Sequence, residues 1–309
     1  MRLSVRSQKG MPGTITGWLW ALPLTLGFPV LGSILPSPAL AQDDNTVDVE
    51  LVLAVDASWS MDFEEQVIQR DGYANAFRSE EVIEAIVYGG YGRVAVTYIE
   101  WAGMGSQEIV VPWTLIDSHE AAHAFADALE RGTPRHFRRT SISGAISFSS
   151  QLFDENQFEG LRKVIDISGD GPNNQGAPVT LARDRAVDAG ITINGLPLMT
   201  NAPGETMGYA IDNLDGYFAE CVIGGGGAFV IPVTTWQEFP QAVRRKLVLE
   251  LAGAMSGDPI DPVGPLNLRQ SGDFLPVIRA QASNPAASDI DCLIGEKIWN
   301  SRRQIWSVP

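Results

Sequence analysis

The residues that could do chemistry stand at three separate places, each beside an apolar run. The first is Asp56, which is followed at alternate positions by Ser58 and Ser60. The second is Thr140, at the head of the sequence Thr-Ser-Ile-Ser-Gly-Ala-Ile. The third is Asp170, which stands between two glycines. Mg²⁺ and Mn²⁺ prefer oxygen ligands, so this set of carboxylates and hydroxyls suits a divalent-metal site if the fold brings the three places together.

A buried sheet has to position these side chains. Residues 47–55 alternate at first and are then continuously apolar, which predicts a strand buried on both faces that ends at Asp56. Residues 161–168 predict a second strand, which ends just before Asp170. A helical pattern over residues 63–86, interrupted near Gly72, predicts one long helix or two short ones. Thr140 precedes another helical pattern, where a plain helix N-cap is the alternative role.

The D-x-S-x-S sequence after a buried strand resembles the metal-ion-dependent adhesion site of the von Willebrand factor type A domain family. That family also takes a threonine from a T-x-[ST]-x-G-A-I stretch and an aspartate from a T-D-G stretch, where this chain has Gly169 for the threonine. The resemblance implies hydroxyl ligands to Mg²⁺ or Mn²⁺ and two aspartates that bind the ion directly or through water. The implied metal residues are Asp56, Ser58, Ser60, Thr140 and Asp170.

The resemblance also implies the fold class and the domain boundaries. We expect a doubly wound α/β fold with a mostly parallel six-stranded sheet, one antiparallel edge strand at residues 108–113, and helices on both faces. The resemblance covers residues 46–255. Residues 256–309 are predicted to form a tail rich in Pro, Asp and Ser, with a possible short helix over 290–306. The stretches V-D-A-S-x-S-M and S-G-D-G-x-N-N further resemble an uncharacterised family of exported bacterial proteins.

Several residues near the predicted site indicate what it binds. Trp59 is expected either at the rim or packed beneath the loop. Asn173 is expected at the rim or in a polar turn. A compact basic cluster is either a solvated surface or an attraction for an acidic partner, and it consists of His136, Arg138 and Arg139. The predicted function is therefore metal-dependent binding of a protein that exposes an Asp or Glu, and not catalysis.

Two other functions stay open from sequence alone. One is a metal-dependent phosphohydrolase with Asp56 as nucleophile, although enzymes that resemble haloacid dehalogenases have an aspartate where this chain has Ser58. The other is a structural domain whose site holds no metal. Asp166 fits none of these interpretations, because a charge inside a predicted buried strand needs a partner that the sequence does not identify.

The first 41 residues resemble a secretory signal. Three basic residues precede an apolar run at 18–35, and Ala39-Leu40-Ala41 predicts cleavage after Ala41, which would place the protein in the periplasm or outside the cell. A membrane anchor is the alternative interpretation of this run.

Composition limits the partners. The chain carries 22 basic and 37 acidic residues, and its net charge of −15 becomes about −18 after loss of the predicted signal, because that segment holds Arg2, Arg6 and Lys9 and no acidic residue. A chain this acidic repels nucleic acid and anionic membranes, so neither is expected as a partner. Cys221 and Cys292 either pair in an oxidising compartment or remain free thiols.

Overall fold

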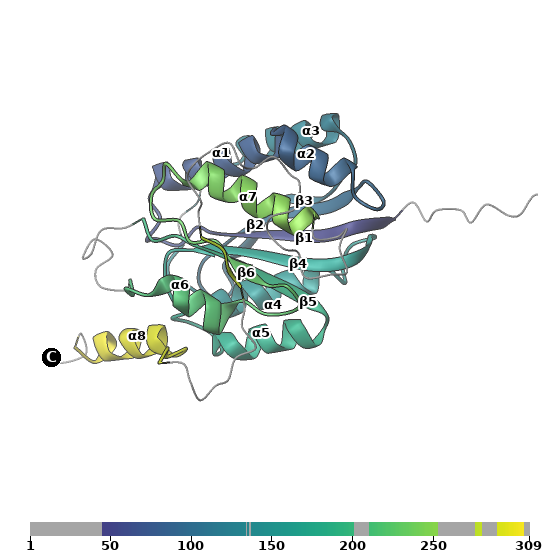
Figure 1. The fold of residues 1–309 in the computed structure, drawn as a ribbon. Helices are drawn as coiled ribbons and strands as arrows, with labels where there is room; N and C mark the ends of the chain where they lie inside the picture. Colours follow the sequence, from purple (N-terminus) through teal and green to yellow (C-terminus); the bar gives the residue numbers. More distant parts are fainter. Residues whose placement is uncertain are drawn as a thin grey trace, which may run out of the picture. The chain divides into compact units, whose positions relative to one another are not determined.

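The computed structural model describes residues 45–133, 135, 137–200, 210–252, 276–279 and 289–305. Strands and helices alternate along most of this part of the chain (Figure 1). The strands are β1 (Thr46–Asp56), β2 (Val94–Trp101), β3 (Gln107–Ile116), β4 (Glu159–Gly169), β5 (Ile191–Pro197), β6 (Phe229–Val230) and β7 (Ile278–Arg279). The helices are α1 (Phe63–Phe77), α2 (Glu80–Val87), α3 (His119–Glu130), α4 (Ile142–Leu152), α5 (Val179–Asp188), α6 (Leu214–Tyr217), α7 (Phe239–Ala252) and α8 (Ile294–Ile305).

The seven strands form one sheet in the order β3-β2-β1-β4-β5-β6-β7. The five inner strands β2, β1, β4, β5 and β6 run parallel to one another, whereas β3 and β7 pair antiparallel with them at the two edges. The predicted doubly wound α/β fold is confirmed, including the antiparallel edge strand β3. The seventh strand is a two-residue segment of the predicted tail, which no hydrophobic alternation marks because it is so short.

Helices cover both faces of the sheet. Figure 1 shows α1, α2, α3 and α7 on one side and α4, α5 and α6 on the other. Successive residues of β1 point to opposite faces and enter two different core clusters, with Val49, Leu51, Leu53 and Val55 in one and Val52 and Ala54 in the other. The continuous apolar run of β1 is therefore explained, because this central strand is buried on both sides.

The helical pattern after β1 divides into two helices at Arg78 and Ser79, not at Gly72. Gly72 instead lies inside α1, where Phe239 of α7 packs against it. A Cβ atom at Gly72 would lie 2.5 Å from the Phe239 ring. The glycine that looks like a helix breaker in the sequence therefore provides room for the contact between α1 and α7.

Asp166 has its buried partner in α7. The Lys246 ammonium lies 2.6 Å from Asp166 Oδ1 and also pairs with Glu250, four residues further along the helix. All three residues are at most 1% exposed. Burial, and then the charge of Asp166, raise the pKa of Glu250 to about 7, against the opposing effect of Lys246. One buried cation thus faces two buried carboxylates.

The predicted tail contributes β7 and α8 to the described part of the chain, and the helix predicted over 290–306 is observed as α8. A disulfide joins Cys221, in a π-helical turn at Phe218–Val222, to Cys292 just before α8. The predicted signal segment, residues 1–41, and the tail residues 256–275 and 280–288 lie outside the described residues. No helix among the described ranges is long and apolar enough to cross a bilayer.

Candidate metal centre

Three loops meet at the edge of the sheet where β1 and β4 end. These strands are parallel neighbours with Val55 opposite Ser168, so their last residues deliver Asp56 and Asp170 to the same edge. The third loop precedes α4, and its place is set by hydrogen bonds to the loop after β4. Thr140 donates its amide to Asn174 Oδ1 at 3.1 Å, and Asn174 donates its amide to the Thr140 carbonyl at 2.9 Å.

Hydrogen bonds connect four of the predicted metal residues. The amide of Ser58 donates to Asp56 Oδ1 at 2.7 Å, and Ser60 Oγ donates to Asp170 Oδ1 at 2.8 Å. The two serine hydroxyl oxygens lie 2.9 Å apart. Thr140 lines a hollow of about 20 Å³ together with Ser60 and Asp170, a volume on the scale of a single bound water. The fold thus brings all five side chains to one place.

The buried carboxylate of Asp56 is only partly hydrogen-bonded. Asp56 is fully buried, and its Oδ2 atom has no hydrogen-bond donor within the described structure. Burial, and then the charge of Asp170, raise the pKa of Asp56 well above its ordinary value, while hydrogen bonds from Ser58 oppose this shift. A buried carboxylate with an unpartnered oxygen beside a second carboxylate and three hydroxyls fits a small divalent cation.

Gly169 adds to this fit. A Cβ atom at Gly169 would lie 3.1 Å from Asp56 Oδ2 and 3.3 Å from the Trp101 ring. The absence of a side chain at Gly169 therefore makes room for the Asp56 carboxylate and for Trp101. In the ranges that the structure describes, no three or more His, Cys, Asp or Glu side chains form a metal-binding group, so a metal ion here would also need the hydroxyls of Ser58, Ser60 and Thr140.

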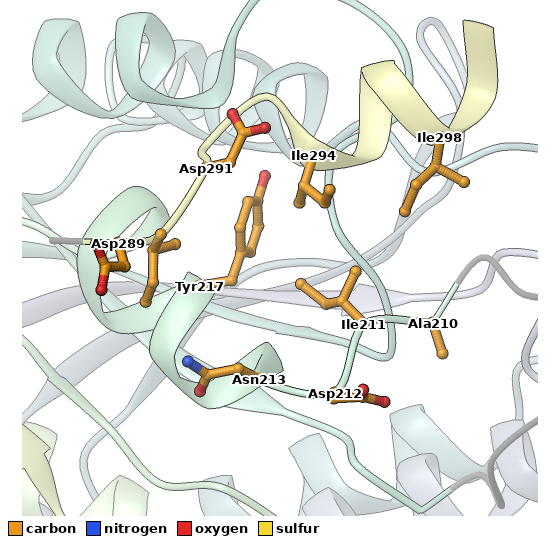
Figure 2. Close-up of a pocket in the computed structure, with 10 residues that line it drawn as sticks. Ala210, Ile211, Asp212, Asn213, Tyr217, Asp289, Asp291, Ile294 and Ile298 are labelled. Carbon is orange, nitrogen blue, oxygen red and sulfur yellow. The ribbon is translucent and has the colours of Figure 1, made fainter. Parts of the chain in front are cut away.

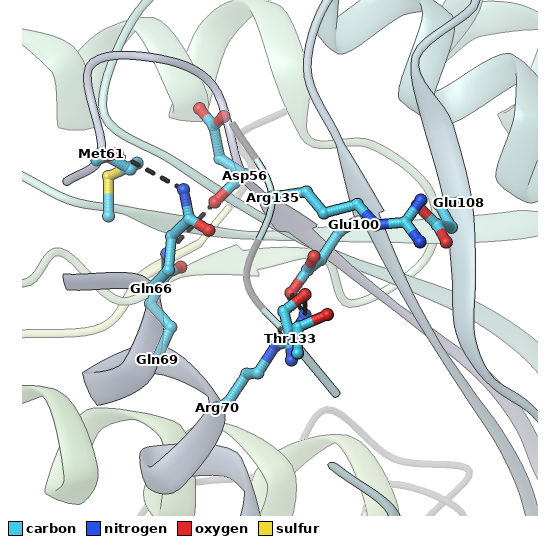
Figure 3. A network of polar contacts seen from close by, with 9 residues as sticks. All are labelled: Asp56, Met61, Gln66, Gln69, Arg70, Glu100, Glu108, Thr133 and Arg135. Carbon is cyan, nitrogen blue, oxygen red and sulfur yellow. Dashed lines mark hydrogen bonds and ion pairs between the residues drawn. The ribbon is translucent and has the colours of Figure 1, made fainter. Parts of the chain in front are cut away.

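The buried face of α1 holds the first loop, and sequence reasoning missed it. Gln69 Nε2 donates to the Asp56 carbonyl at 3.1 Å, and Gln66 Nε2 donates to the Met61 carbonyl at 3.4 Å (Figure 3). Arg70 forms an ion pair of 2.7 Å with Glu100 at the end of β2. The sequence signal for these residues was three polar positions, Gln66, Gln69 and Arg70, on the side of α1 that also carries the buried Tyr73.

The predicted rim residues have different outcomes. Trp59 is 59% exposed, so it does not pack beneath its loop, and the Arg138 guanidinium lies over its ring at 4.4 Å from the centroid. Arg139 has a positive φ of 81° and stacks over Trp299 of α8. Asn173 is fully buried and bonded on several sides, so its predicted position at an exposed rim is wrong. His136 lies outside the described residues.

Comparisons with known proteins identify a family and a set of similar folds. A family described as "Protein of unknown function (DUF1194)" matches residues 46–255. Among curated proteins, none matches this sequence. A solved structure of proximal thread matrix protein 1 from the mussel byssus, described with a zinc-occupied MIDAS motif, is 17% identical with a TM-score of 0.47, and the match covers 67% of this chain and 48% of that one.

Two bacterial structures are similar at the same level. The von Willebrand factor type A protein from Catenulispora acidiphila is 16% identical with a TM-score of 0.45, and the match covers 67% of this chain and 43% of that one. The pilus adhesin SpaC from Lactobacillus rhamnosus GG is 14% identical with a TM-score of 0.48, over 67% of this chain and 30% of that one. The chain therefore spans less than half the length of these three proteins.

Proposed function

Since this chain belongs to the DUF1194 family of proteins of unknown function, its activity has to be argued from its own residues, and we propose that it is an exported module that binds a protein partner through a divalent metal ion. The ion is Mg²⁺ or Mn²⁺, and the partner contributes an exposed Asp or Glu. The observation that carries this proposal is the fully buried Asp56 carboxylate, whose Oδ2 has no donor in the described structure.

The five side chains would share the work of holding the ion. Ser58, Ser60 and Thr140 offer hydroxyl oxygens, while Asp56 and Asp170 offer the negative charge. Ser60 is exposed, so the site opens to solvent on that side. A bound divalent ion would supply a Lewis-acidic position that accepts a further carboxylate oxygen, since two aspartates only just neutralise its charge.

The surroundings of the site favour an acidic partner. Arg138 stacks over the exposed Trp59, which lies between the two serines of the first loop. A guanidinium held on an aromatic ring keeps its charge while losing little freedom on binding, so this pair would steer and contact an acidic surface. We therefore assign Trp59 and Arg138 to the partner-binding rim.

The phosphohydrolase alternative agrees less well with the geometry of Asp56. A nucleophilic carboxylate has to approach the phosphorus of its substrate, whereas Asp56 is fully buried and its Oδ1 accepts the Ser58 amide. A buried and hydrogen-bonded carboxylate is better suited to holding an ion from below. Metal-dependent binding is therefore the function that we propose.

The proposal is tested by thermal unfolding of the purified protein in EDTA and in Mg²⁺, Mn²⁺ or Zn²⁺. A ligand present at about 100 times its Kd stabilises the folded state by about 2.7 kcal/mol, which corresponds to roughly 5–10 °C in Tm for a domain of this size. We expect this shift for the unaltered protein and none for Asp56→Asn. An unchanged Tm for the unaltered protein with all three ions would refute metal binding.

The control for this experiment has to be chosen with care. Asp62 is not suitable, because it forms a capping box with Glu65 at the start of α1, with both hydrogen bonds at 2.8 Å. Its loss would cost about 1 kcal/mol of stability with or without metal. Glu64→Gln is better matched, since Glu64 is an exposed carboxylate in the first turn of the same helix. It should keep the full metal-dependent shift.

A further inference from the structure

The appended helix α8 contacts both loops that carry Thr140 and Asp170. Glu296 Oε1 accepts a hydrogen bond from Asn173 Nδ2 at 2.7 Å, and Asn173 stands three residues after Asp170. The Trp299 ring lies 3.5 Å from the guanidinium carbon of Arg139, which immediately precedes Thr140. One short helix thus holds two of the three loops of the candidate metal centre.

Asn173 transmits this contact to the rest of the site. Its Oδ1 accepts the Ser143 amide at 3.0 Å, which ties the loop after β4 to the first turn of α4. The backbone amide of Asn173 donates to the Tyr217 hydroxyl at 3.2 Å. Asn173 has no exposed surface, so the loss of its Glu296 acceptor would leave a buried amide group without one of its partners. The helix α8 therefore supplies one of the contacts that orient this loop.

Gly295 in the first turn of α8 lies against the Asn173 backbone, but part of the same helix borders a hollow. Ile294 and Ile298 face Ile211 and Tyr217 across a cavity of about 440 Å³ (Figure 2). Side chains that border a cavity lack contact atoms on that side and contribute less dispersion energy. The covalent attachment is close by, because Cys292 stands two residues before α8 and is bonded to Cys221, 71 positions earlier in the chain. The disulfide therefore keeps α8 at a high local concentration beside the two loops.

We propose that Glu296 and Trp299 of α8 are positioning residues for the metal centre, and that the Cys221–Cys292 disulfide makes affinity for divalent ions depend on redox state. This inference rests on the proposed function. Reduction by a dithiol transfers two electrons and two protons to the disulfide, which yields two cysteine thiols and an oxidised, disulfide-form reductant. The helix α8 then leaves the loops, so Asn173 loses its Glu296 acceptor and Arg139 loses its contact with Trp299.

The test compares Mn²⁺ binding to the full-length mature protein before and after treatment with dithiothreitol, by isothermal titration calorimetry, with thiol titration to verify reduction. Groups that orient metal ligands change affinity by about 10–100-fold when they are removed, so a Kd weakened by at least about tenfold is expected on reduction. The Cys221→Ser/Cys292→Ser protein should behave like the reduced protein with or without dithiothreitol. An unchanged Kd after complete reduction overturns the proposal.

Variants of α8 with the disulfide intact test the same role without any reduction. Glu296→Ala should weaken Mn²⁺ binding by about tenfold in the oxidised protein and have little further effect in the reduced protein. The reason is that the substitution and the reduction both remove the same contact, between Glu296 and Asn173. Asn300→Ala, an exposed position on the same helix, is the matched control and should keep the affinity of the oxidised protein. Independent, additive effects of Glu296→Ala and reduction would contradict positioning through α8.

Hydrogen exchange of the metal-free protein provides a readout that does not need an ion. Amides of residues 140–144 and 170–175 should exchange faster after reduction and in Glu296→Ala, while those of β1 should not change. If the oxidised protein binds no metal, the proposed function fails, but faster exchange at these loops still supports the positioning role. Equal exchange in the oxidised and reduced proteins overturns it.

Discussion

Replacing Glu250 with glutamine should remove a pH dependence of stability that the Lys246 cluster creates. The cluster holds two carboxylates and one ammonium, each at most 1% exposed, and the folded-state pKa of Glu250 is about 7 against an ordinary value of 4.5. Because this pKa is raised, the folded state binds the Glu250 proton more tightly than the unfolded state does. The associated stability is fully present below pH 4.5 and is lost as the pH rises through about 7.

The size of the effect follows from the two pKa values. One pKa unit corresponds to about 1.4 kcal/mol, so the full difference amounts to about 3 kcal/mol, most of which falls between pH 5 and pH 8. For a domain of this size that is roughly 5–10 °C in Tm. Glu250→Gln should flatten the dependence by this amount, since the amide keeps the oxygen that accepts from Asn194 but does not titrate.

The assay is urea unfolding of the unaltered protein and of the variant at pH 5 and pH 8. The change in unfolding free energy between the two pH values is measured for each protein, and the two changes are then subtracted so that the effects of other titrating groups cancel. Glu155→Gln, an exposed carboxylate, serves as control and should keep the original pH dependence. Lys246→Met should make the pH dependence steeper. It should destabilise the fold by about 3–5 kcal/mol at pH 8, because it leaves two buried carboxylates without their cation. Identical pH profiles for Glu250→Gln and the unaltered protein would refute this account of the cluster.

Three further outcomes are expected. Arg138→Gln should slow association with an acidic partner severalfold at low salt and much less at high salt, because it removes a charge beside Trp59 at the predicted rim; salt-independent weakening in surface plasmon resonance would argue against steering. Gly72→Ala should destabilise the domain by about 1–3 kcal/mol in urea unfolding, since a Cβ there would lie 2.5 Å from the Phe239 ring, and a neutral result would mean that α1 and α7 adjust freely. Intact-mass measurement of the exported protein should give Gln42 as the first residue, and retention of residues 18–35 would identify them as an anchor.

The frame of the fold could be predicted from the sequence, and so could the set of candidate ligands. The apolar run of β1, the glycine-bounded turns and the alternation of strand and helix patterns are local signals, and rules of parallel-sheet topology convert them into a doubly wound order. The D-x-S-x-S sequence is also a local signal, and the topology of the sheet decides what it lies beside. Because β1 and β4 are parallel and both end in aspartate-containing loops, Asp56 and Asp170 meet at one edge of the sheet.

Which polar residues are buried, and which partners they have, could not be predicted from the sequence. The Lys246 partner of Asp166 stands 80 positions later in the chain, and its helical pattern gives no sign that the ammonium points inward. Asn173 reads as a polar turn residue, yet it is fully buried and bonded to Glu296 of α8, a helix that follows a disulfide between cysteines 71 positions apart. Local periodicity fixes which face of an element is apolar, but a contact between distant segments depends on how several elements pack at once, and no single stretch of sequence carries that information.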